Sequence, residues 1–181
     1  MALKSTIYKA DLQIADMDRH YYQTHSLTLA RHPSETDERM MVRLLAFARH
    51  ADEALLFGEG IASDEEPDLW RKDLTGTIEQ WIEMGQPEEK WVRKACGRSQ
   101  QVVIYSYARS TPLWWQPISS KLERLENLSV YQIAAETTQA IAKLAQRSMQ
   151  LQCTIQDGLL WLADGNNQVQ VDFEVLKAAS R

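Results

Sequence analysis

The sequence predicts a mixed α+β fold (α/β), in which a central series of elements runs in the order helix, three strands, helix, strand, with extra β-hairpins before and after it. Three observations predict this fold. Residues 35–51 have the periodicity of an amphipathic helix, residues 101–107 form an unbroken β-rich run, and residues 67–97 are typical of strand, turn, strand, loop and helix. A chain of 181 residues forms one domain by default, so we expect a single domain over residues 1–181.

The N-terminal segment predicts a β-hairpin. Residues 5–16 and 20–30 alternate apolar and polar positions on either side of a turn at 16–18. The positions expected to point inward are Tyr8, Ala10, Leu12, Ile14, Leu27 and Leu29. We therefore expect one buried face and one solvated face for this hairpin.

The predicted helix 35–51 begins at a weak capping box, Ser34-Glu35-Thr36-Asp37. Its buried stripe is expected to contain Met41, Leu44, Leu45 and Ala48. Glu38 lies at the border of this stripe. Such an acid is either an ordinary N-terminal carboxylate favoured by the helix dipole or a residue of a functional site.

A buried strand is expected over 54–61, and it carries Gly58-Glu59-Gly60. A dinucleotide-binding fingerprint needs further glycines and a helix directly after the strand, and neither follows here. We therefore interpret these glycines as a bulge or a tight strand end.

Strands are expected at 68–72 and 77–84, around a turn at 73–76. Asp68 opens the first strand and Glu83 lies near the end of the second. An antiparallel pairing brings these two strand ends together, and two neighbouring carboxylates suit a hard divalent cation. The alternative is a solvated strand end with two unrelated acids.

The helix expected at 87–96 has Pro87 at its first position and Gly97 as its C-terminal cap. On a helical wheel Lys90 lies opposite the apolar face, so we expect it to point to water. Lys94 and Arg93 flank the apolar face. Either side chain can extend along the edge of the core toward the two carboxylates.

The remaining segments predict an irregular loop at 111–117, followed by alternating helices and strands. Trp114 and Trp115 in that loop are expected to pack on the core, and the alternative is stacking on nucleic-acid bases. The last strands are expected to join the N-terminal hairpin or to extend the central sheet. The expected elements are helices at 118–125 and 134–148 and strands at 128–133, 149–156, 159–163 and 168–175.

Composition restricts the class of protein. The net charge of −5 disfavours a generally basic nucleic-acid-binding surface and leaves room only for a local basic groove. No apolar run approaches the roughly 18 residues that span a bilayer, and the first residues do not resemble a signal peptide, so we expect a cytoplasmic protein without membrane contact. Cys96 and Cys153 are isolated, and the four histidines lack the spacing of a zinc site.

Pro67-Asp68, the hairpin that follows and Ile82-Glu83-Met84 resemble the PD-(D/E)XK nuclease superfamily, which has a restriction-endonuclease-like core. The resemblance implies that Asp68 and Glu83 hold magnesium. The superfamily places a Lys two residues after this Glu, where the present chain has Gly85. Because some members carry that Lys on the following helix, the resemblance implies Lys94 in this role. It also implies Glu38, from the first core helix, as a third acid near the metal.

Taken as a whole, the chain is similar to the YaeQ family of small bacterial proteins, which belongs to this fold group. The similarity extends over nearly the whole chain, through SETDERMMVRLLAFARHA, GEGI, PDLW, WIEMGQP and RKACGR. This resemblance implies the nuclease-like fold for the complete chain.

Two functions follow from these residues and resemblances. The first is a Mg-dependent (or Mn-dependent) phosphodiesterase acting on nucleic acid, with Asp68 and Glu83 as metal ligands, Lys94 as the catalytic cation and Gln86 orienting a water molecule. The second is a binding or regulatory protein that keeps the nuclease scaffold without catalysis. A connection with transcription elongation, which the family resemblance implies, would fit the second function.

Overall fold

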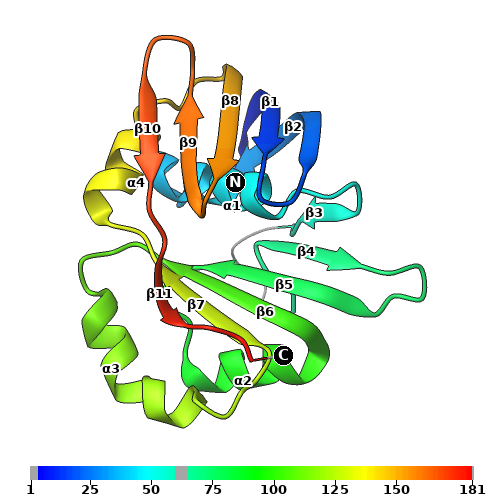
Figure 1. The fold of residues 1–181 in the computed structure, drawn as a ribbon, viewed down its shortest axis with the longest axis vertical. Helices are drawn as coiled ribbons and strands as arrows, with labels where there is room; N and C mark the ends of the chain where they lie inside the picture. The colour runs from blue at the N-terminus through cyan, green and yellow to red at the C-terminus, as the bar shows by residue number, and fades with distance from the viewer. Residues whose placement is uncertain (1–3, 60–64, 181) are drawn as a thin grey trace. The chain divides into compact units, whose positions relative to one another are not determined.

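The computed structural model describes residues 4–59 and 65–180, and these residues form two compact units. Unit 1 combines the N-terminal residues up to 50 with 136–173, and unit 2 combines 51–135 with the C-terminal segment from 174. The described residues contain four helices and eleven strands, arranged in two sheets (Figure 1). The predicted mixed α+β class is therefore confirmed.

Unit 1 contains a five-stranded sheet in the order β10-β9-β8-β1-β2. The N-terminal hairpin is confirmed, because β1 pairs antiparallel with β2 and its alternate side chains are buried. The C-terminal strands extend this hairpin, with β8 parallel to β1. The strands are β1 (Thr6–Asp16), β2 (Tyr21–Arg31), β8 (Ser148–Gln156), β9 (Leu159–Ala163) and β10 (Gln168–Val171).

The helices of unit 1 are α1 (Asp37–His50) and α4 (Ala135–Ala142). Thr36 caps α1, because its Oγ1 accepts the backbone N–H of Arg39 at 3.1 Å. Nine consecutive residues of α1, 40–48, are buried, including the whole predicted stripe. The single helix predicted at 134–148 is wrong beyond residue 142. Tighter turns follow as far as Ala145, and from Ser148 the chain pairs with β1 as a strand.

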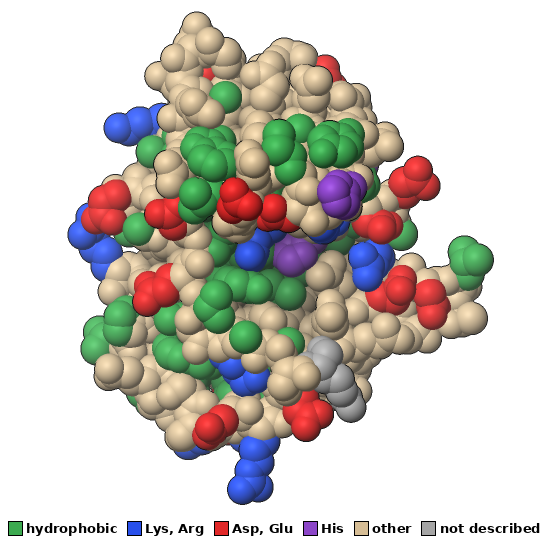
Figure 2. All heavy atoms as spheres, viewed as in Figure 1, with side chains coloured by type: hydrophobic (Ala, Val, Ile, Leu, Met, Phe, Trp, Pro, Cys, Tyr) green, Lys and Arg blue, Asp and Glu red, His purple; other side chains and the backbone are tan. Residues whose placement is uncertain are grey.

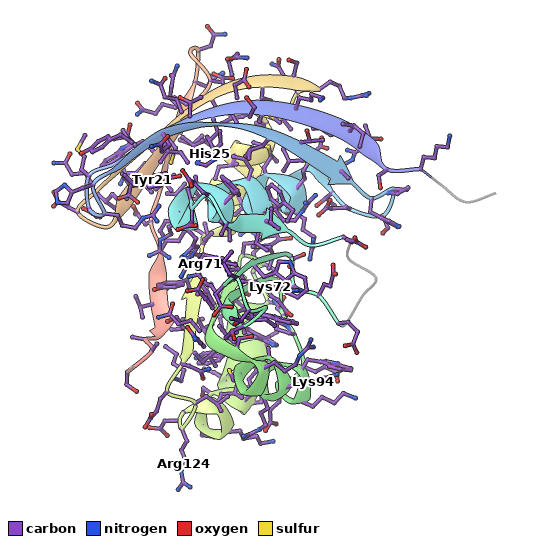
Figure 3. The ribbon with its side chains drawn as sticks, turned by 90° about the vertical axis from the view of Figure 1, so that its right-hand side faces the viewer. Tyr21, His25, Arg71, Lys72, Lys94 and Arg124 are labelled. Atoms are coloured by element: carbon purple, nitrogen blue, oxygen red, sulfur yellow. The ribbon has the colours of Figure 1, made fainter. Side chains whose placement is uncertain are left out.

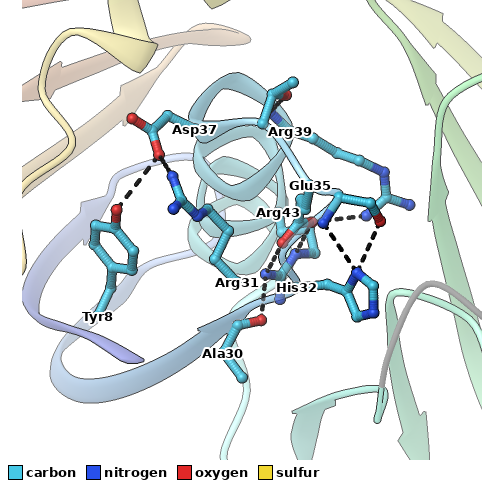
Figure 4. Close-up of polar contacts among 10 residues, drawn as sticks. Tyr8, Ala30, Arg31, His32, Glu35, Asp37, Arg39 and Arg43 are labelled. Atoms are coloured by element: carbon cyan, nitrogen blue, oxygen red, sulfur yellow. Dashed lines mark hydrogen bonds and ion pairs between the residues drawn. The ribbon is translucent and has the colours of Figure 1, made fainter. Parts of the chain in front are cut away.

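A buried ionic network lies at the start of α1 (Figure 4). The Glu35 carboxylate accepts hydrogen bonds from Arg43 Nε at 2.9 Å, Arg43 Nη2 at 2.7 Å and Arg39 Nη1 at 2.9 Å. Arg43 Nη2 also donates to the Ala30 carbonyl at 3.1 Å, which joins β2 to α1. Buried charges are tolerated when they are paired and hydrogen-bonded in this way.

Unit 2 contains a six-stranded sheet in the order β11-β7-β6-β5-β4-β3. β6 lies between β5 and β7, is parallel to both, and is buried from Val102 to Ser106. This confirms the strand predicted at 101–107 as one covered on both faces. The strands are β3 (Leu55–Phe57), β4 (Leu69–Lys72), β5 (Ile78–Met84), β6 (Ser99–Ser106), β7 (Leu128–Gln132) and β11 (Glu174–Lys177).

Helices α2 (Glu89–Arg98) and α3 (Thr111–Leu122) pack on one face of this sheet. The shared core includes Val92 and Ala95 from α2 and Trp81 from β5. α2 begins and ends two residues later than predicted, with Glu88 as N-cap and Ser99 as C-cap. Gly97 therefore lies inside the helix rather than at its cap.

The prediction of an irregular loop at 111–117 is wrong, because these residues form the first half of α3. Pro112 is in the first turn, where its missing N–H costs nothing, and Pro117 removes only one internal hydrogen bond. The two tryptophans do pack against the core of unit 2, as predicted, and Trp114 Nε1 donates to the Pro87 carbonyl at 2.9 Å. Burial of these indoles offsets the interruption at Pro117.

Two predicted strands differ in extent. The strand expected at 54–61 is β3, only 55–57, and the part of the prediction that covers 60–61 lies outside the described residues. The strand expected at 168–175 divides into β10 and β11, which belong to different sheets. The C-terminal strands thus both join the hairpin and extend the second sheet.

Gly58 lies where two backbone segments of unit 2 approach closely. A Cβ at this position would stand 1.9 Å from the Pro67 carbonyl oxygen, and the Gly58 N–H donates to the Asp68 carbonyl at 2.8 Å. We expect Gly58→Ala to lower the free energy of unfolding by about 1–3 kcal/mol, because the backbone before Asp68 must move. Denaturant unfolding measures this effect.

Gly97→Ala is the matched control for that measurement. Apart from the neighbouring residues and backbone of α2 itself, no atom of the described residues lies within 4 Å of an added Cβ at Gly97, so alanine there is expected to stabilise α2 by up to about 1 kcal/mol. A Gly58→Ala protein as stable as the wild type would show that the two segments can separate without cost.

The chain segment from α1 to β6 has the element order that was predicted: helix, three strands, helix, strand. α1 belongs to unit 1 and the other five elements belong to unit 2. The single domain over 1–181 and the restriction-endonuclease-like core stay predictions. In the described parts of the chain, no helix has the length and apolar character needed to cross a membrane.

Candidate functional site

Asp68 and Glu83 lie at neighbouring strand ends in unit 2. β4 and β5 are antiparallel, with Trp70 opposite Trp81 and Leu69 opposite Ile82. The next step of this register places Asp68, directly before β4, opposite Glu83. The predicted antiparallel pairing is therefore confirmed, and the hydrogen bond from the Trp81 indole places the Glu83 side chain on the face of β5 that carries Trp81 and α2.

Hydrogen bonds orient both carboxylates. Asp68 Oδ2 accepts the backbone N–H of Met84 at 2.8 Å, which directs the Asp68 side chain to the end of β5. Glu83 Oε1 accepts the indole N–H of Trp81 at 2.7 Å. An ionised carboxylate offers about four lone-pair sites, so single hydrogen bonds of this kind leave it able to bind a cation.

Lys94 stands on α2, half-exposed (Figure 3). Its Nζ lies 3.6 Å from Glu65 Oε1 and 5.2 Å from the centre of the Trp91 ring. These contacts place its ammonium beside the segment that leads into Asp68. Direct contact between Lys94 and either Asp68 or Glu83 stays a prediction.

The three cationic side chains of α2 that were compared on the helical wheel, Lys90, Arg93 and Lys94, have different surroundings in the structure. Arg93 Nε donates to Glu89 Oε1 at 3.0 Å, and its Nη2 donates to the Lys121 carbonyl of α3. Lys90 is 71% exposed, and its Nζ lies 3.9 Å from Glu88 Oε2. Arg93 is thus engaged with α3, and Lys90 points to solvent as predicted.

Gln86 lies just beyond β5, at the edge of a pocket of about 280 Å³. Its Nε2 donates to Ser110 Oγ at 2.9 Å, so its amide bridges the segments that follow β5 and β6. The pocket lies at the carboxyl ends of two parallel strands, a common place for ligand binding in such sheets. Its lining residues are Gly85, Gln86, Ser106, Tyr107, Ala108 and Ser110.

Glu38 belongs to unit 1, on the first turn of α1. Its Oε2 accepts a hydrogen bond from the buried Thr138 hydroxyl of α4 at 2.8 Å. This contact gives Glu38 a structural role in joining the two helices of unit 1. Its assignment as a third acid of the site stays a prediction.

Sequence reasoning missed a set of cation and indole contacts on the α2 face of unit 2. Lys72 Nζ lies 3.7 Å from the centre of the Trp70 ring, and the Arg98 guanidinium carbon lies 5.2 Å from that of Trp81. Trp70 and Trp81 themselves pack edge to face at 6.0 Å. In the sequence, these contacts were indicated only by the spacing of Lys94 and Arg98, which lie one helical turn apart and therefore on the same side of α2.

Other reactive groups are less suited to chemistry. Burial raises the pKa of the Cys96 thiol to about 11 and that of Cys153 to about 12, so neither supplies a thiolate at neutral pH. Within residues 4–59 and 65–180, no three His, Cys, Asp or Glu side chains are grouped so as to hold a metal ion. A cation bound by Asp68 and Glu83 would therefore complete its coordination with water or substrate oxygens.

Comparison with known proteins identifies the family. Residues 1–173 match the family model described as "YaeQ protein". The chain is 48% identical over 175 residues to the uncharacterized protein YaeQ of Escherichia coli (strain K12), and 46% identical over 175 residues to that of Salmonella typhi, covering 96% of each chain in both comparisons.

Two crystal structures have the same fold. The YaeQ protein from Xanthomonas axonopodis pv. citri has a TM-score of 0.93 and 48% identity, covering 96% of this chain and 99% of that one. The YaeQ protein from Pseudomonas syringae has a TM-score of 0.93 and 32% identity, covering 98% of both chains. On the family match and these identities, the chain belongs to the YaeQ family.

Proposed function

We propose that this chain is a magnesium-dependent phosphodiesterase that cleaves nucleic acid and has a restriction-endonuclease-like core. The observation that carries the proposal is the antiparallel register of β4 and β5, which brings Asp68, directly before β4, to the end of β5 that carries Glu83. Each carboxylate is oriented by a hydrogen bond from β5, through the Met84 N–H and the Trp81 indole.

The donor set fits a hard divalent cation such as Mg²⁺ or Mn²⁺. Magnesium is commonly held by one or two carboxylates together with waters and substrate phosphates, and Asp68 and Glu83 supply such a pair. When bound, the ion would polarise a phosphoryl oxygen and make water a better nucleophile.

The chain's own residues then have separate tasks. Asp68 and Glu83 hold the cation in a position fixed by β5. Lys94, on α2, would stabilise the attacking hydroxide or the negative charge that develops on the phosphoryl group. Gln86 would orient the water from the end of β5. In the hydrolysis, the water oxygen bonds to phosphorus and gives up its proton to solvent, one P–O ester bond breaks, and the leaving oxygen takes up a proton and departs as a hydroxyl group.

Nucleic acid is the favoured substrate because cations and indoles alternate on the α2 face. Lys72 lies over Trp70 and Lys94 lies near Trp91, and both of these indoles are partly exposed. Basic groups track a phosphate backbone, and aromatic rings can stack on bases. Elsewhere acidic and basic side chains are interspersed, as the face in Figure 2 shows, in keeping with the net charge of −5.

Gly85 favours a second candidate function, that of a binding or regulatory protein without catalysis. A link to transcription elongation would fit this second function. Gly85 has a φ of +107°, a conformation that a lysine rarely adopts. The backbone therefore disfavours the superfamily's usual Lys at this position. Catalysis then depends on a cation from another element, and without one the scaffold could only bind.

Titration with Mn²⁺ by calorimetry tests the metal ligands. Asp68→Asn and Glu83→Gln are each expected to weaken Mn²⁺ binding by at least about tenfold, because residues that merely orient metal ligands already contribute 10–100-fold. Glu79→Gln is the matched control, since Glu79 is another acid of β5 and its Oε1 lies 3.6 Å from Arg71 Nε. Equal affinity in all four proteins would mean that the two acids are ordinary surface groups.

A further inference from the structure

Lys94 and Arg98 share one carboxylate in unit 2. Lys94 Nζ lies 3.6 Å from Glu65 Oε1, and Arg98 Nη1 lies 3.7 Å from Glu65 Oε2. The two cations are one turn apart on α2, so both project from the same side of the helix. Each of them therefore faces one oxygen of the same anionic group.

Indole rings border both cations. Lys94 Nζ lies 5.2 Å from the centre of the Trp91 ring, and the Arg98 guanidinium carbon lies 5.2 Å from that of Trp81. Such contacts restrict the flexible side chains and so reduce the entropy lost when an anion binds. This arrangement is a preformed pair of donors for an anion that has at least two oxygens.

The ion pairs that Glu65 forms with Lys94 and Arg98 are exposed to solvent, so another anion can replace Glu65. The Glu65 side chain is 73% exposed, and those of Lys94 and Arg98 are 46% and 36% exposed. Exposed ion pairs contribute a factor of at most about five to an equilibrium constant. An external anion can therefore replace the Glu65 carboxylate at little cost.

The pair of cations lies on the same side of β5 as Trp81 and Glu83. The Arg98 guanidinium lies over the ring of Trp81, and the indole N–H of Trp81 donates to Glu83 at 2.7 Å. Glu65 itself precedes Asp68 by three residues. Contacts thus run from Arg98 through Trp81 to Glu83, which places this anion site beside the proposed cleavage site.

We propose that Lys94 and Arg98 bind a phosphate of a nucleic-acid backbone, and that Glu65 occupies this phosphate position in the free protein. The choice of nucleic acid as the ligand rests on the proposed function. Phosphate oxygens take the place of the Glu65 oxygens, with Arg98 suited to two parallel hydrogen bonds.

Binding of a fluorescently labelled DNA duplex, measured by anisotropy in EDTA at low ionic strength, tests this inference without any cleavage. Glu65→Gln is expected to bind about two- to fivefold more tightly than the wild type, the factor that one exposed ion pair supplies. Arg98→Gln is expected to bind more weakly and to reduce the salt dependence by about one released counterion.

Glu53→Gln is the charge-matched control, because Glu53 is an exposed acid of the same unit and loses the same charge. It is expected to leave the affinity nearly unchanged. A double-mutant cycle completes the test. In a Lys94→Gln, Arg98→Gln protein, Glu65→Gln is expected to have no effect, because the cations with which Glu65 competes are gone.

Two results would overturn the inference and leave the phosphodiesterase proposal standing. In the first, Glu65→Gln raises the affinity for the duplex no more than Glu53→Gln does. In the second, Glu65→Gln still raises the affinity in the protein that lacks both cations. If neither the wild type nor Glu65→Gln binds the duplex, the phosphate site is refuted together with nucleic acid as the substrate. Loss of cleavage or of Mn²⁺ binding cannot produce these outcomes, because the assay contains no divalent ion.

Discussion

Replacing Glu35 with alanine is expected to lower the free energy of unfolding by about 3–5 kcal/mol. The Glu35 side chain is only 1% exposed and accepts three hydrogen bonds from the guanidinium groups of Arg39 and Arg43. Without the carboxylate, the buried Arg43 guanidinium keeps its positive charge but loses its ion pair with Glu35. Denaturant unfolding followed by circular dichroism measures the loss.

Asp37→Ala is the control for this prediction. Asp37 also lies at the start of α1 and pairs with Arg31, but its side chain is 46% exposed. Its removal is expected to cost about 1 kcal/mol or less, as is usual for exposed ion pairs. Equal losses in the two variants would show that burial does not strengthen the Glu35 network.

Replacing Lys94 with alanine is expected to reduce metal-dependent phosphodiester cleavage by a factor on the order of 10²–10³, the usual effect of losing one group that stabilises developing charge. Lysine suits this role because a compact ammonium on a flexible stem can approach both a water molecule and a metal ion. The half-exposed position of Lys94 predicts an unchanged melting temperature. Cleavage of a labelled oligonucleotide and a thermal scan give the two readouts.

Lys90→Ala is the matched control, because Lys90 lies on the same helix, also near Trp91, and points to solvent. It is expected to keep both activity and stability. Full cleavage by Lys94→Ala would assign the catalytic cation to another residue. Similar losses in both variants would indicate a general effect of positive charge on α2.

Local patterns predicted much of the fold because they report directly on secondary structure. Alternation at Tyr8, Ala10, Leu12 and Ile14 predicted β1, and the buried side chains of β1 follow it. The β-rich run around Val103 predicted a strand covered on both faces, and β6 lies between two parallel neighbours. Pairing at the β4–β5 hairpin followed from turn chemistry, which fixes register locally.

Features that depend on tertiary contacts could not be predicted in the same way. The prolines at 112 and 117 indicated a loop, yet packing of Trp114 and Trp115 on the core of unit 2 stabilises a helix there. Trp81 shares one strand face with Glu79 and Glu83, and local alternation does not show which element covers it. The structure buries that tryptophan under α2, because β5 is an interior strand.

The candidate site was predictable only as far as one hairpin determines it. The register of β4 and β5 brought Asp68 near Glu83. The partner of Lys94, Glu65, belongs to a segment that is distant along the chain, so the hairpin does not determine this ion pair. No local pattern indicated that Glu65 would lie between Lys94 and Arg98. Ion pairs between separate segments depend on the completed fold, and for this reason the anion site emerged only from the structure.

Anomalous diffraction from crystals of the wild-type protein soaked in Mn²⁺ tests the central claim most directly. We expect one strong peak at about 2.0–2.1 Å from oxygens of both Asp68 and Glu83, the distance at which carboxylates bind small hard cations. The same soak of Asp68→Asn crystals is expected to give no peak there. Wild-type crystals with no peak between these carboxylates, at Mn²⁺ concentrations that occupy other acidic sites, would contradict the proposed metal site and favour the binding-protein function.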